Sequence, residues 1–143
     1  MRIAIACDHA GYEYKNKLVV YLQRLGHDVE DFGCHSVESM DYPDTAHPMA
    51  LSIESKNNVV GVALCGSGNG ISMTLNKHQG VRAALCWTAE IAELARLHND
   101  ANIVSLPARF ISYDEAELIV DKFIETAFEG GRHQVRVDKI AVK

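Results

Sequence analysis

The segment that most constrains the fold is the apolar run Val59-Val60-Gly61-Val62-Ala63-Leu64, which leads into Cys65 and then into a loop with glycine at every second position. The run contains no polar residue, whereas a strand with one face in water would alternate apolar and polar side chains. It therefore predicts a strand buried on both faces, within a parallel sheet that helices cover on both sides. The loop Gly66-Ser67-Gly68-Asn69-Gly70 could close its backbone N–H groups around a small anion.

Strand-like and helix-like segments alternate along the chain. Short apolar segments predict five strands, over residues 2–7, 27–32, 59–64, 81–86 and 102–106. Helical spacing of apolar residues and capping signals predict helices over residues 12–25, 48–55, 71–77, 88–97 and 112–128. This alternation predicts a single α/β domain of three layers, in which a five-stranded parallel sheet lies between two layers of helices. In such folds, ligands bind beyond the carboxyl ends of the strands.

Length and composition exclude several classes of protein. The 143 residues suffice for one domain with a buried core, expected to span residues 1–143. The net charge of −5 argues against nucleic acid as the main partner, and no apolar run approaches the ~20 residues that cross a membrane. The four cysteines form no C-x-x-C pair, which argues against a zinc or redox site and, with no secretion signal, predicts a cytoplasmic protein.

The last segment differs from the rest of the chain. Gly130-Gly131 stops the preceding helix, and a locally basic stretch follows in an otherwise acidic protein. We expect residues 130–143 to form a C-terminal arm that packs on a neighbouring subunit. On a helix, the four-residue spacing of Arg132 and Arg136 would turn both guanidinium groups the same way, which suits a phosphate. A solvated basic tail is the alternative.

Cys65 and its glycine loop form the first candidate site. A helix N-terminus stabilises a thiolate, so Cys65 could act as a base or a nucleophile, and the N–H groups of Gly66 to Gly70 could bind an oxyanion or a phosphate. The alternative is a buried cysteine before a tight turn. A nucleotide site fits poorly, because glycines at 66, 68 and 70 do not satisfy G-x-G-x-x-G and the Walker spacing is absent.

Three further groups are candidates because of their positions. Asp8-His9 follows the first predicted strand and could handle hydroxyl groups, or Asp8 could simply cap the next helix. His98, in the predicted turn before the fifth strand, could shuttle protons or be an ordinary surface histidine. Arg109 follows the fifth strand and could bind phosphate. The other histidines show no metal-ligand spacing, and no metal site is expected.

Seven segments, in order along essentially the whole chain, share a pattern with one family: Ile5-Ala6-Cys7-Asp8-His9-Ala10-Gly11, Asp41-Tyr42-Pro43, Cys65-Gly66-Ser67-Gly68-Asn69-Gly70-Ile71-Ser72, Asn76-Lys77, Gly80-Val81-Arg82-Ala83, His98-Asn99-Asp100-Ala101-Asn102 and Glu129-Gly130-Gly131-Arg132-His133. In these segments the chain resembles the type B ribose-5-phosphate isomerases, a family that also includes the galactose-6-phosphate isomerases. None of the segments is specific alone, but together they are highly specific.

The resemblance implies an aldose–ketose isomerase that acts on ribose 5-phosphate and ribulose 5-phosphate, with a Rossmann-like fold and no metal or organic cofactor. It implies a homodimer or tetramer whose active sites lie at the subunit interface. By position, Cys65 is the base that moves a proton between C1 and C2, and His98 assists ring opening, with Asp8 and Ser67 nearby. The other implied contacts are to enediolate oxygens and hydroxyls, from Gly66, Ser67, Gly68, Asn69, Gly70 and Asn99, and to the phosphate, from His9, Arg109, Arg132 and Arg136.

Three positions refine the resemblance. One branch of the family lacks the cysteine and uses a glutamate just after the glycine loop as the base, but here that position is Ile71, which cannot take a proton. Asn69 departs from the apolar residue that many cysteine-type members carry. Arg132 and Arg136 favour ribose 5-phosphate as the substrate. The alternatives are an isomerase of allose 6-phosphate or galactose 6-phosphate, a non-catalytic phosphosugar-binding subunit, and a nucleotide-binding module.

Overall fold

One parallel sheet organises the chain, and the computed structural model describes it over residues 1–142. The strands lie in the order β2-β1-β3-β5-β4. Their bounds are β1 Arg2–Cys7, β2 Asp28–Asp31, β3 Val60–Cys65, β4 Ala83–Leu85 and β5 Ile103–Pro107. The helices are α1 Tyr12–Arg24, α2 Pro43–Glu54, α3 Asn69–Leu75, α4 Ala89–Asn99, α5 Tyr113–Glu125 and α6 Arg132–Asp138, with a short 3-10 turn at His9–Gly11. The predicted fold with a five-stranded parallel sheet is confirmed.

The apolar run that leads into Cys65 forms β3, the middle strand of the sheet. All six residues of β3 are buried, and the strand pairs in parallel with β1 on one side and β5 on the other. Cys65, its last residue, lies opposite Pro107 of β5, and Leu64 lies opposite Cys7 of β1. The ends of three neighbouring strands therefore meet at one edge of the sheet.

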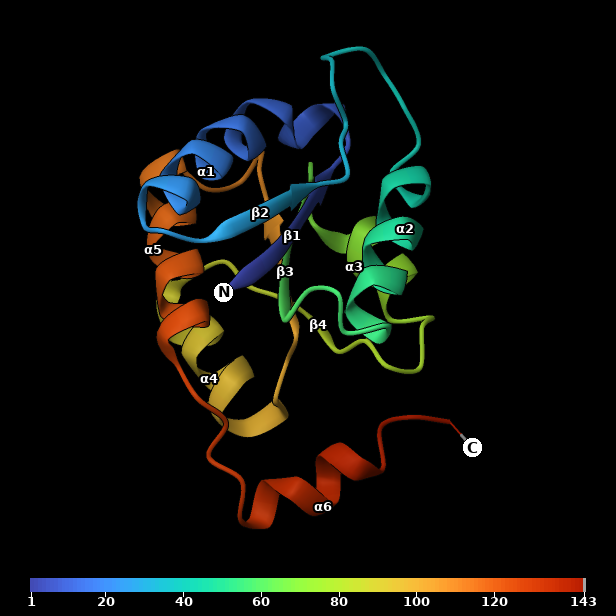
Figure 1. Cartoon of the computed structure of the whole chain (residues 1–143), viewed down its shortest axis with the longest axis vertical. Helices are drawn as coiled ribbons and strands as arrows, with labels where there is room; N and C mark the ends of the chain where they lie inside the picture. The colour runs from blue at the N-terminus through green and yellow to red at the C-terminus, as the bar shows by residue number, and fades with distance from the viewer. Residues whose placement is uncertain (143) are drawn as a thin grey trace.

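Helices cover both faces of the sheet, as Figure 1 shows: α1, α4 and α5 lie on one face, and α2 and α3 on the other. On the first face, large strand residues such as Ile5 and Val62 pack against α1 and α5. On the second face, the strands carry small residues, so α2 can approach closely. A Cβ on Gly61 would lie 2.6 Å from Cε of Met49, which shows why no larger residue fits there without movement.

Two predicted helix boundaries were wrong by three residues or more. The helix expected over residues 48–55 begins at Pro43, because proline has no N–H to lose in the first turn, and it continues through Pro48. The helix expected over residues 112–128 ends at Glu125, where Thr126 turns to an extended conformation and its carbonyl accepts a hydrogen bond from Nε of Arg96 at 3.1 Å. The chain between α5 and α6 is thereby fixed to α4.

The C-terminal arm contains a short helix that contacts its own chain. His133 and Val137 are the buried residues of α6, and the backbone N–H of Val142 donates to Oε1 of Gln79 at 2.8 Å. Figure 1 shows α6 at the amino edge of the sheet, away from the loops that follow the strands. Packing of the arm on a neighbouring subunit stays a prediction. Among the described residues, no helix has both the length and the apolar character needed to span a membrane.

The buried thiol of Cys86, the residue that follows β4, predicts how stability changes in alkali. Burial raises the pKa of Cys86 to about 12 from an ordinary 9.0. Between these values the unfolded chain releases a proton that the folded chain keeps, so the free energy of unfolding falls as pH rises, by up to ~1.4 kcal/mol per pH unit. We expect Cys86→Ala to make this decline shallower by about that slope in urea unfolding measured across the window.

The matched control for that measurement is Val104→Ala, which also truncates a fully buried side chain but removes no titratable group. Its unfolding free energy should be lower than that of the wild type at every pH, with the alkaline slope unchanged. Equal slopes for Cys86→Ala and the wild type would contradict the prediction.

Candidate active site

Three of the predicted site segments meet at the carboxyl edge of the sheet. The backbone N–H of Asp8 donates to the carbonyl of Leu64 at 3.2 Å, which fixes the end of β1 beside the end of β3. On the other side of β3, the N–H of Ala108 donates to the carbonyl of Cys65 at 3.0 Å, and the N–H of Arg109 donates to the carbonyl of Gly66, also at 3.0 Å. The topology thus places Asp8, His9, the Cys65 loop and Arg109 together, as the sequence predicted.

Cys65 is held rigidly at this edge. It is the last residue of the buried middle strand, and the residue is only 5% exposed. The thiol lies on the face of the sheet that α2 and α3 cover. A substrate carbon must therefore come to the thiol, because the strand leaves Cys65 little freedom to move.

The loop after Cys65 requires its glycines. Gly68 has φ +77°, a conformation that side chains rarely adopt, and an added Cβ would also meet the side chain of Leu85. A Cβ on Gly70 would lie 2.6 Å from Oη of Tyr42, so this glycine lets the Tyr42 ring approach the first turn of α3. Tyr42 is a residue of this edge that the sequence analysis did not count among the site residues.

The same loop presents unpaired hydrogen-bond donors. Among residues 1–142, the N–H groups of Gly66, Ser67 and Gly68 have no acceptor, whereas the N–H of Asn69 donates to Oγ of Ser67 at 3.3 Å. Oγ of Ser72 donates to the carbonyl of Gly68 at 2.7 Å and holds the loop in place. A fixed row of free amide donors beside a thiol can bind an oxyanion that develops next to the reacting carbon.

Asp8 and His9 are both tied into the local structure. The carboxylate of Asp8 accepts the N–H of Ala10 at 2.9 Å, so the helix-capping role considered for it is present. Nδ1 of His9 accepts the N–H of Met40 at 3.2 Å, which leaves Nε2 as the nitrogen that can meet a ligand. Asp8 is 7% exposed, whereas His9 is half-buried.

The remaining predicted residues lie at the opposite edge of the sheet. His98 and Asn99 occupy the last turn of α4, which extends two residues beyond the predicted end at residue 97. The turn that follows leads into β5, and the carbonyl of Asn102 accepts the N–H of Gly61 at 2.8 Å, near the start of β3. Cys65 lies four residues further along that strand, which corresponds to about 13 Å. One chain therefore does not bring His98 to Cys65.

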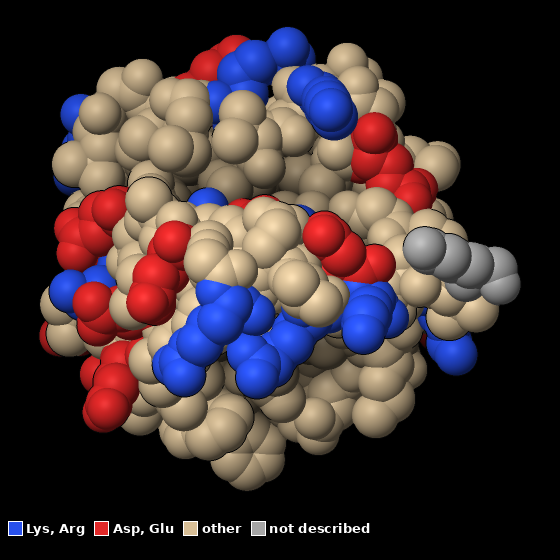
Figure 2. Space-filling model, turned by 90° about the horizontal axis from the view of Figure 1, so that it is seen from below, with Lys and Arg blue, Asp and Glu red and all other residues tan. Residues whose placement is uncertain are grey.

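Arg132 and Arg136 belong to this second group. Both side chains are exposed on α6, and Nη1 of Arg136 donates to the carbonyl of Arg132 at 3.2 Å. Figure 2 looks at the molecule from the end where α6 lies and shows basic side chains gathered across it, in a chain of net charge −5. This end can bind an anion that the carboxyl edge of the same chain does not reach.

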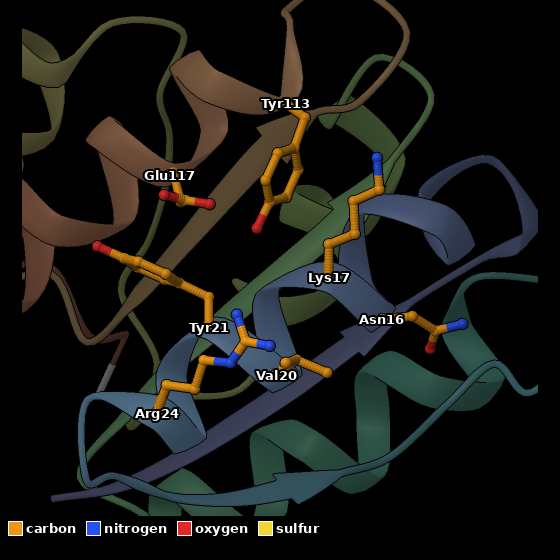
Figure 3. A pocket seen from close by; sticks show the side chains of 7 residues that line it. All are labelled: Asn16, Lys17, Val20, Tyr21, Arg24, Tyr113 and Glu117. Atoms are coloured by element: carbon orange, nitrogen blue, oxygen red, sulfur yellow. The ribbon is translucent and has the colours of Figure 1, made fainter.

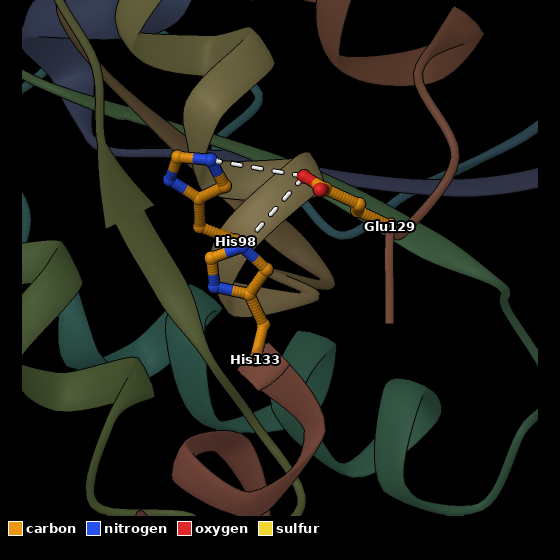
Figure 4. A group of neighbouring side chains, drawn as sticks. All are labelled: His98, Glu129 and His133. Carbon is orange, nitrogen blue, oxygen red and sulfur yellow. Dashed lines mark ion pairs between the residues drawn. The ribbon is translucent and has the colours of Figure 1, made fainter. Parts of the chain in front are cut away.

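Two residues that the sequence analysis did not single out accompany His98. Figure 4 shows Glu129 facing the rings of His98 and His133, and the two rings stack with centroids 4.3 Å apart and planes 15° from parallel. Burial lowers the pKa of His133, and the neighbouring His98 and Arg132 add to that effect. In the sequence, Glu129 and His133 are recognisable only as residues next to the Gly130-Gly131 pair, and no local pattern relates them to His98. Their proximity to His98 depends on how the arm folds back.

A separate hollow between α1 and α5 contains none of the predicted site residues. It measures about 440 Å³ and is lined by Asn16, Lys17, Val20, Tyr21, Arg24, Tyr113 and Glu117 (Figure 3). Several of its polar groups already have partners within the chain. Oη of Tyr21 donates to Asp121 at 2.7 Å, which raises the pKa of Tyr21 to about 12, and Nζ of Lys17 lies 5.1 Å from the Tyr113 ring centroid.

Known proteins resemble this chain in sequence and fold over nearly its whole length. The model of the Ribose/Galactose Isomerase family matches residues 3–140. Ribose-5-phosphate isomerase B of Escherichia coli is 40% identical over 139 residues, which are 97% of this chain and 93% of that protein. A ribose 5-phosphate isomerase of Thermotoga maritima is 49% identical with a TM-score of 0.96, over 98% of this chain and 97% of that one.

One solved structure holds a sugar phosphate. It is ribose-5-phosphate isomerase B from Mycoplasma genitalium with bound ribulose-5-phosphate, which is 40% identical with a TM-score of 0.93 and covers 97% of this chain and 93% of that one. The match of the family model, the sequence identity and the shared fold agree over nearly every residue. This chain belongs to the ribose/galactose isomerase family.

Proposed function

We propose that this protein is an aldose–ketose isomerase that interconverts ribose 5-phosphate and ribulose 5-phosphate. The observation that carries the proposal is the rigid placement of the Cys65 thiol beside three backbone N–H groups that have no acceptor among residues 1–142. The family and the sugar phosphate bound to a relative narrow the substrate to a phosphorylated sugar. We expect the reaction to take place in the cytoplasm, where thiols are kept reduced.

The reaction moves one proton between neighbouring carbons. Cys65, as the thiolate, takes the proton from C2 of the open-chain aldose, and the electron pair moves onto the carbonyl oxygen to give an enediolate. The hydroxyl proton on O2 passes to O1, and the same thiol returns the first proton to C1, which yields the ketose. The N–H groups of Gly66, Ser67 and Gly68 stabilise the oxyanion, and a single such donor is typically worth ~3 kcal/mol in the transition state. Asn69 and Gly70 complete this side of the site.

The neighbouring residues support Cys65 as the base. Ile71, at the position where the other branch of the family has glutamate, is fully buried in the core and has no proton to exchange. At the end of β3 and the start of α3, the thiol of Cys65 is thus the group suited to act as the base. Ser67, exposed on the same loop, can contact the sugar from the solvent side.

We further propose a homodimer in which each active site uses both chains. One chain supplies the carboxyl-edge set, which consists of Asp8, His9, the Cys65 loop and Arg109. The partner supplies the amino-edge set, which consists of His98, Asn99, Arg132 and Arg136. The support is that each set is incomplete alone: the first has the base and the oxyanion donors, and the second has most of the guanidinium groups and the histidine. A two-fold axis would create two complete sites.

Isomerisation of a cyclic pentose phosphate also requires ring opening. The ring form hides the carbonyl group, so a proton must reach the ring oxygen before C2 becomes acidic. In the shared site, His98 of the second chain carries that proton from the anomeric hydroxyl to the ring oxygen as the bond between C1 and the ring oxygen breaks. Arg132 and Arg136 hold the phosphate with Arg109 and His9. Phosphate binding far from the reacting carbons orients the sugar without touching the chemistry.

The base is tested by Cys65→Ala. We expect this variant to lose isomerisation and the incorporation of deuterium from heavy water into the sugar, while it still binds ribose 5-phosphate in calorimetry. Cys86→Ala is the matched control, since it removes another buried thiol and should keep its activity at neutral pH. Deuterium incorporation at the wild-type rate in Cys65→Ala would remove Cys65 from the mechanism. Running the wild type with allose 6-phosphate and galactose 6-phosphate in parallel identifies the preferred sugar.

The shared site is tested by complementation. Cys65→Ala and His98→Ala chains, co-expressed with different tags and purified through both, form a hybrid dimer with one complete site of two. We expect the hybrid to recover about half of the wild-type activity although each parent is nearly inactive. A hybrid of Cys65→Ala with Asp8→Ala has no complete site, because both residues belong to the same set, and should stay inactive. An inactive first hybrid would refute the division between chains.

Phosphate binding is tested by Arg136→Ala. Loss of one charge-assisted contact typically weakens binding by ~1.5–3 kcal/mol, so we expect KM for ribose 5-phosphate to rise roughly tenfold or more while kcat changes little. Lys139→Ala, which removes a positive charge at the end of the same helix, is the control and should leave KM nearly unchanged. A fall in kcat at constant KM would assign Arg136 to the chemistry instead of phosphate binding.

A further inference from the structure

Glu129 and His133, which have no role in the proposed reaction so far, lie beside His98. The backbone N–H of Glu129 donates to the carbonyl of Leu97 at 3.1 Å, one residue before His98, and the N–H of His133 donates to the carbonyl of Gly130 at 3.1 Å. Glu129 is therefore anchored to the last turn of α4 by a backbone bond, and His133 is tied by another to Gly130, the residue that follows Glu129. Their position relative to His98 is built into the fold.

The three side chains form a compact group. Oε2 of Glu129 lies 3.6 Å from Nε2 of His133 and 3.9 Å from Nε2 of His98, both within ion-pair range. Figure 4 shows that the carboxylate faces the Nε2 edge of both rings, and that Nδ1 of His98 points away from it. In the proposed shared site, Nδ1 is thus the nitrogen of His98 that remains free to meet a sugar.

Burial separates the roles of the two imidazoles. The side chain of His133 is 8% exposed, and its Nε2 is buried without a hydrogen-bond partner among the described residues. The side chain of His98 is 39% exposed, so this ring reaches solvent and His133 does not. A buried ring that stacks on a half-exposed one restricts the plane of the exposed ring.

We propose that Glu129 and His133 are positioning residues for His98. Glu129 attracts the proton of His98 to Nε2 and so leaves the lone pair of Nδ1 free. Nδ1 can then take the proton of the anomeric hydroxyl as the bond between C1 and the ring oxygen breaks, and pass it to the ring oxygen, while His133 fixes the plane of the imidazole by stacking. A carboxylate that faces one nitrogen of a histidine ring favours the tautomer that carries its proton on that nitrogen. This inference rests on the proposed function, since it assigns His98 to ring opening.

A bound metal ion is the other chemistry that these groups allow, since their ligand atoms lie within 4.8 Å of one another. Two observations favour a role in positioning the proton of His98 over the binding of a metal ion. The planes of the two rings are 15° from parallel, so their nitrogen lone pairs run side by side and do not converge on one point. Arg132 lies next to His133 in the chain, and its positive charge opposes a second cation. Zinc binding is included as an outcome of the test.

The chemistry of the substrate separates ring opening from proton transfer. Ribulose 5-phosphate cannot form a furanose ring, because the oxygen on C5 carries the phosphate. Exchange of its C1 proton with heavy water therefore needs the base and the oxyanion donors but no ring opening. Conversion of cyclic ribose 5-phosphate needs ring opening as well. Substitution of a residue that acts only through His98 should therefore slow the conversion of ribose 5-phosphate and leave the C1 exchange of ribulose 5-phosphate unchanged.

The experiment compares Glu129→Gln and His133→Phe with the wild type in the intact protein. For Glu129→Gln, we expect kcat with ribose 5-phosphate to fall at least about tenfold, with KM and C1 exchange of ribulose 5-phosphate within about twofold. Nitrogen-15 NMR of the His98 ring should show the Nε2–H tautomer in the wild type and a shift towards Nδ1–H in the variant. His133→Phe keeps a flat ring for stacking and should retain kcat within about threefold.

The matched control is Glu125→Gln, which neutralises an exposed carboxylate at the end of α5 and should change none of these quantities. Unchanged kcat in Glu129→Gln, equal losses of conversion and exchange, or an unchanged His98 tautomer would each overturn the proposal. So would binding of zinc to the wild type, measured by calorimetry, that Glu129→Gln removes. Failure of the proposed function is read separately, from full C1 exchange in Cys65→Ala.

Discussion

Burial of the middle strand is the constraint on which the rest of the structure depends. Because β3 lies between two parallel strands and under helices on both faces, every one of its six residues is buried and its backbone is bonded on both sides. Cys65 inherits that rigidity as the last residue of the strand. The glycine loop then starts from a fixed point, so its N–H groups and the thiol keep one relative geometry, which electrostatic stabilisation of an oxyanion needs.

Local sequence patterns predicted the parts of the fold that depend on local physics. The apolar run, the glycine loop and most helices follow from hydrophobic period, capping residues and glycine, so the α/β class and the site at the carboxyl edge could be predicted. The start of α2 at Pro43 could not, because Pro48 within the helix looked like a helix start. The order of the strands and the helix at Arg132–Asp138 depend on contacts between distant residues, such as the packing of α6 on α4.

The division of the predicted site follows from topology. In a parallel α/β fold, each strand ends at one edge of the sheet, and each connecting helix returns the chain to the opposite edge. Residues that follow a strand, such as Asp8, Cys65 and Arg109, are therefore separated from a residue that ends a helix, such as His98. No choice of side chain within one copy can remove this separation. A second copy can, and a symmetric pair provides the missing half to both sites.

The C-terminal arm joins the residues of the amino-edge set into one unit. Stacking of His133 on His98 and the backbone bond from Glu129 to Leu97 join α6 to the end of α4. The arginines of α6 and the histidine of α4 therefore belong to one body, although more than thirty residues separate them in the sequence. When these arginines hold a phosphate in the proposed site, the position of His98 relative to the sugar ring is set at the same time. Binding energy from the phosphate is thereby converted into alignment of the group that carries the proton, which is how binding remote from the reacting atoms accelerates a reaction.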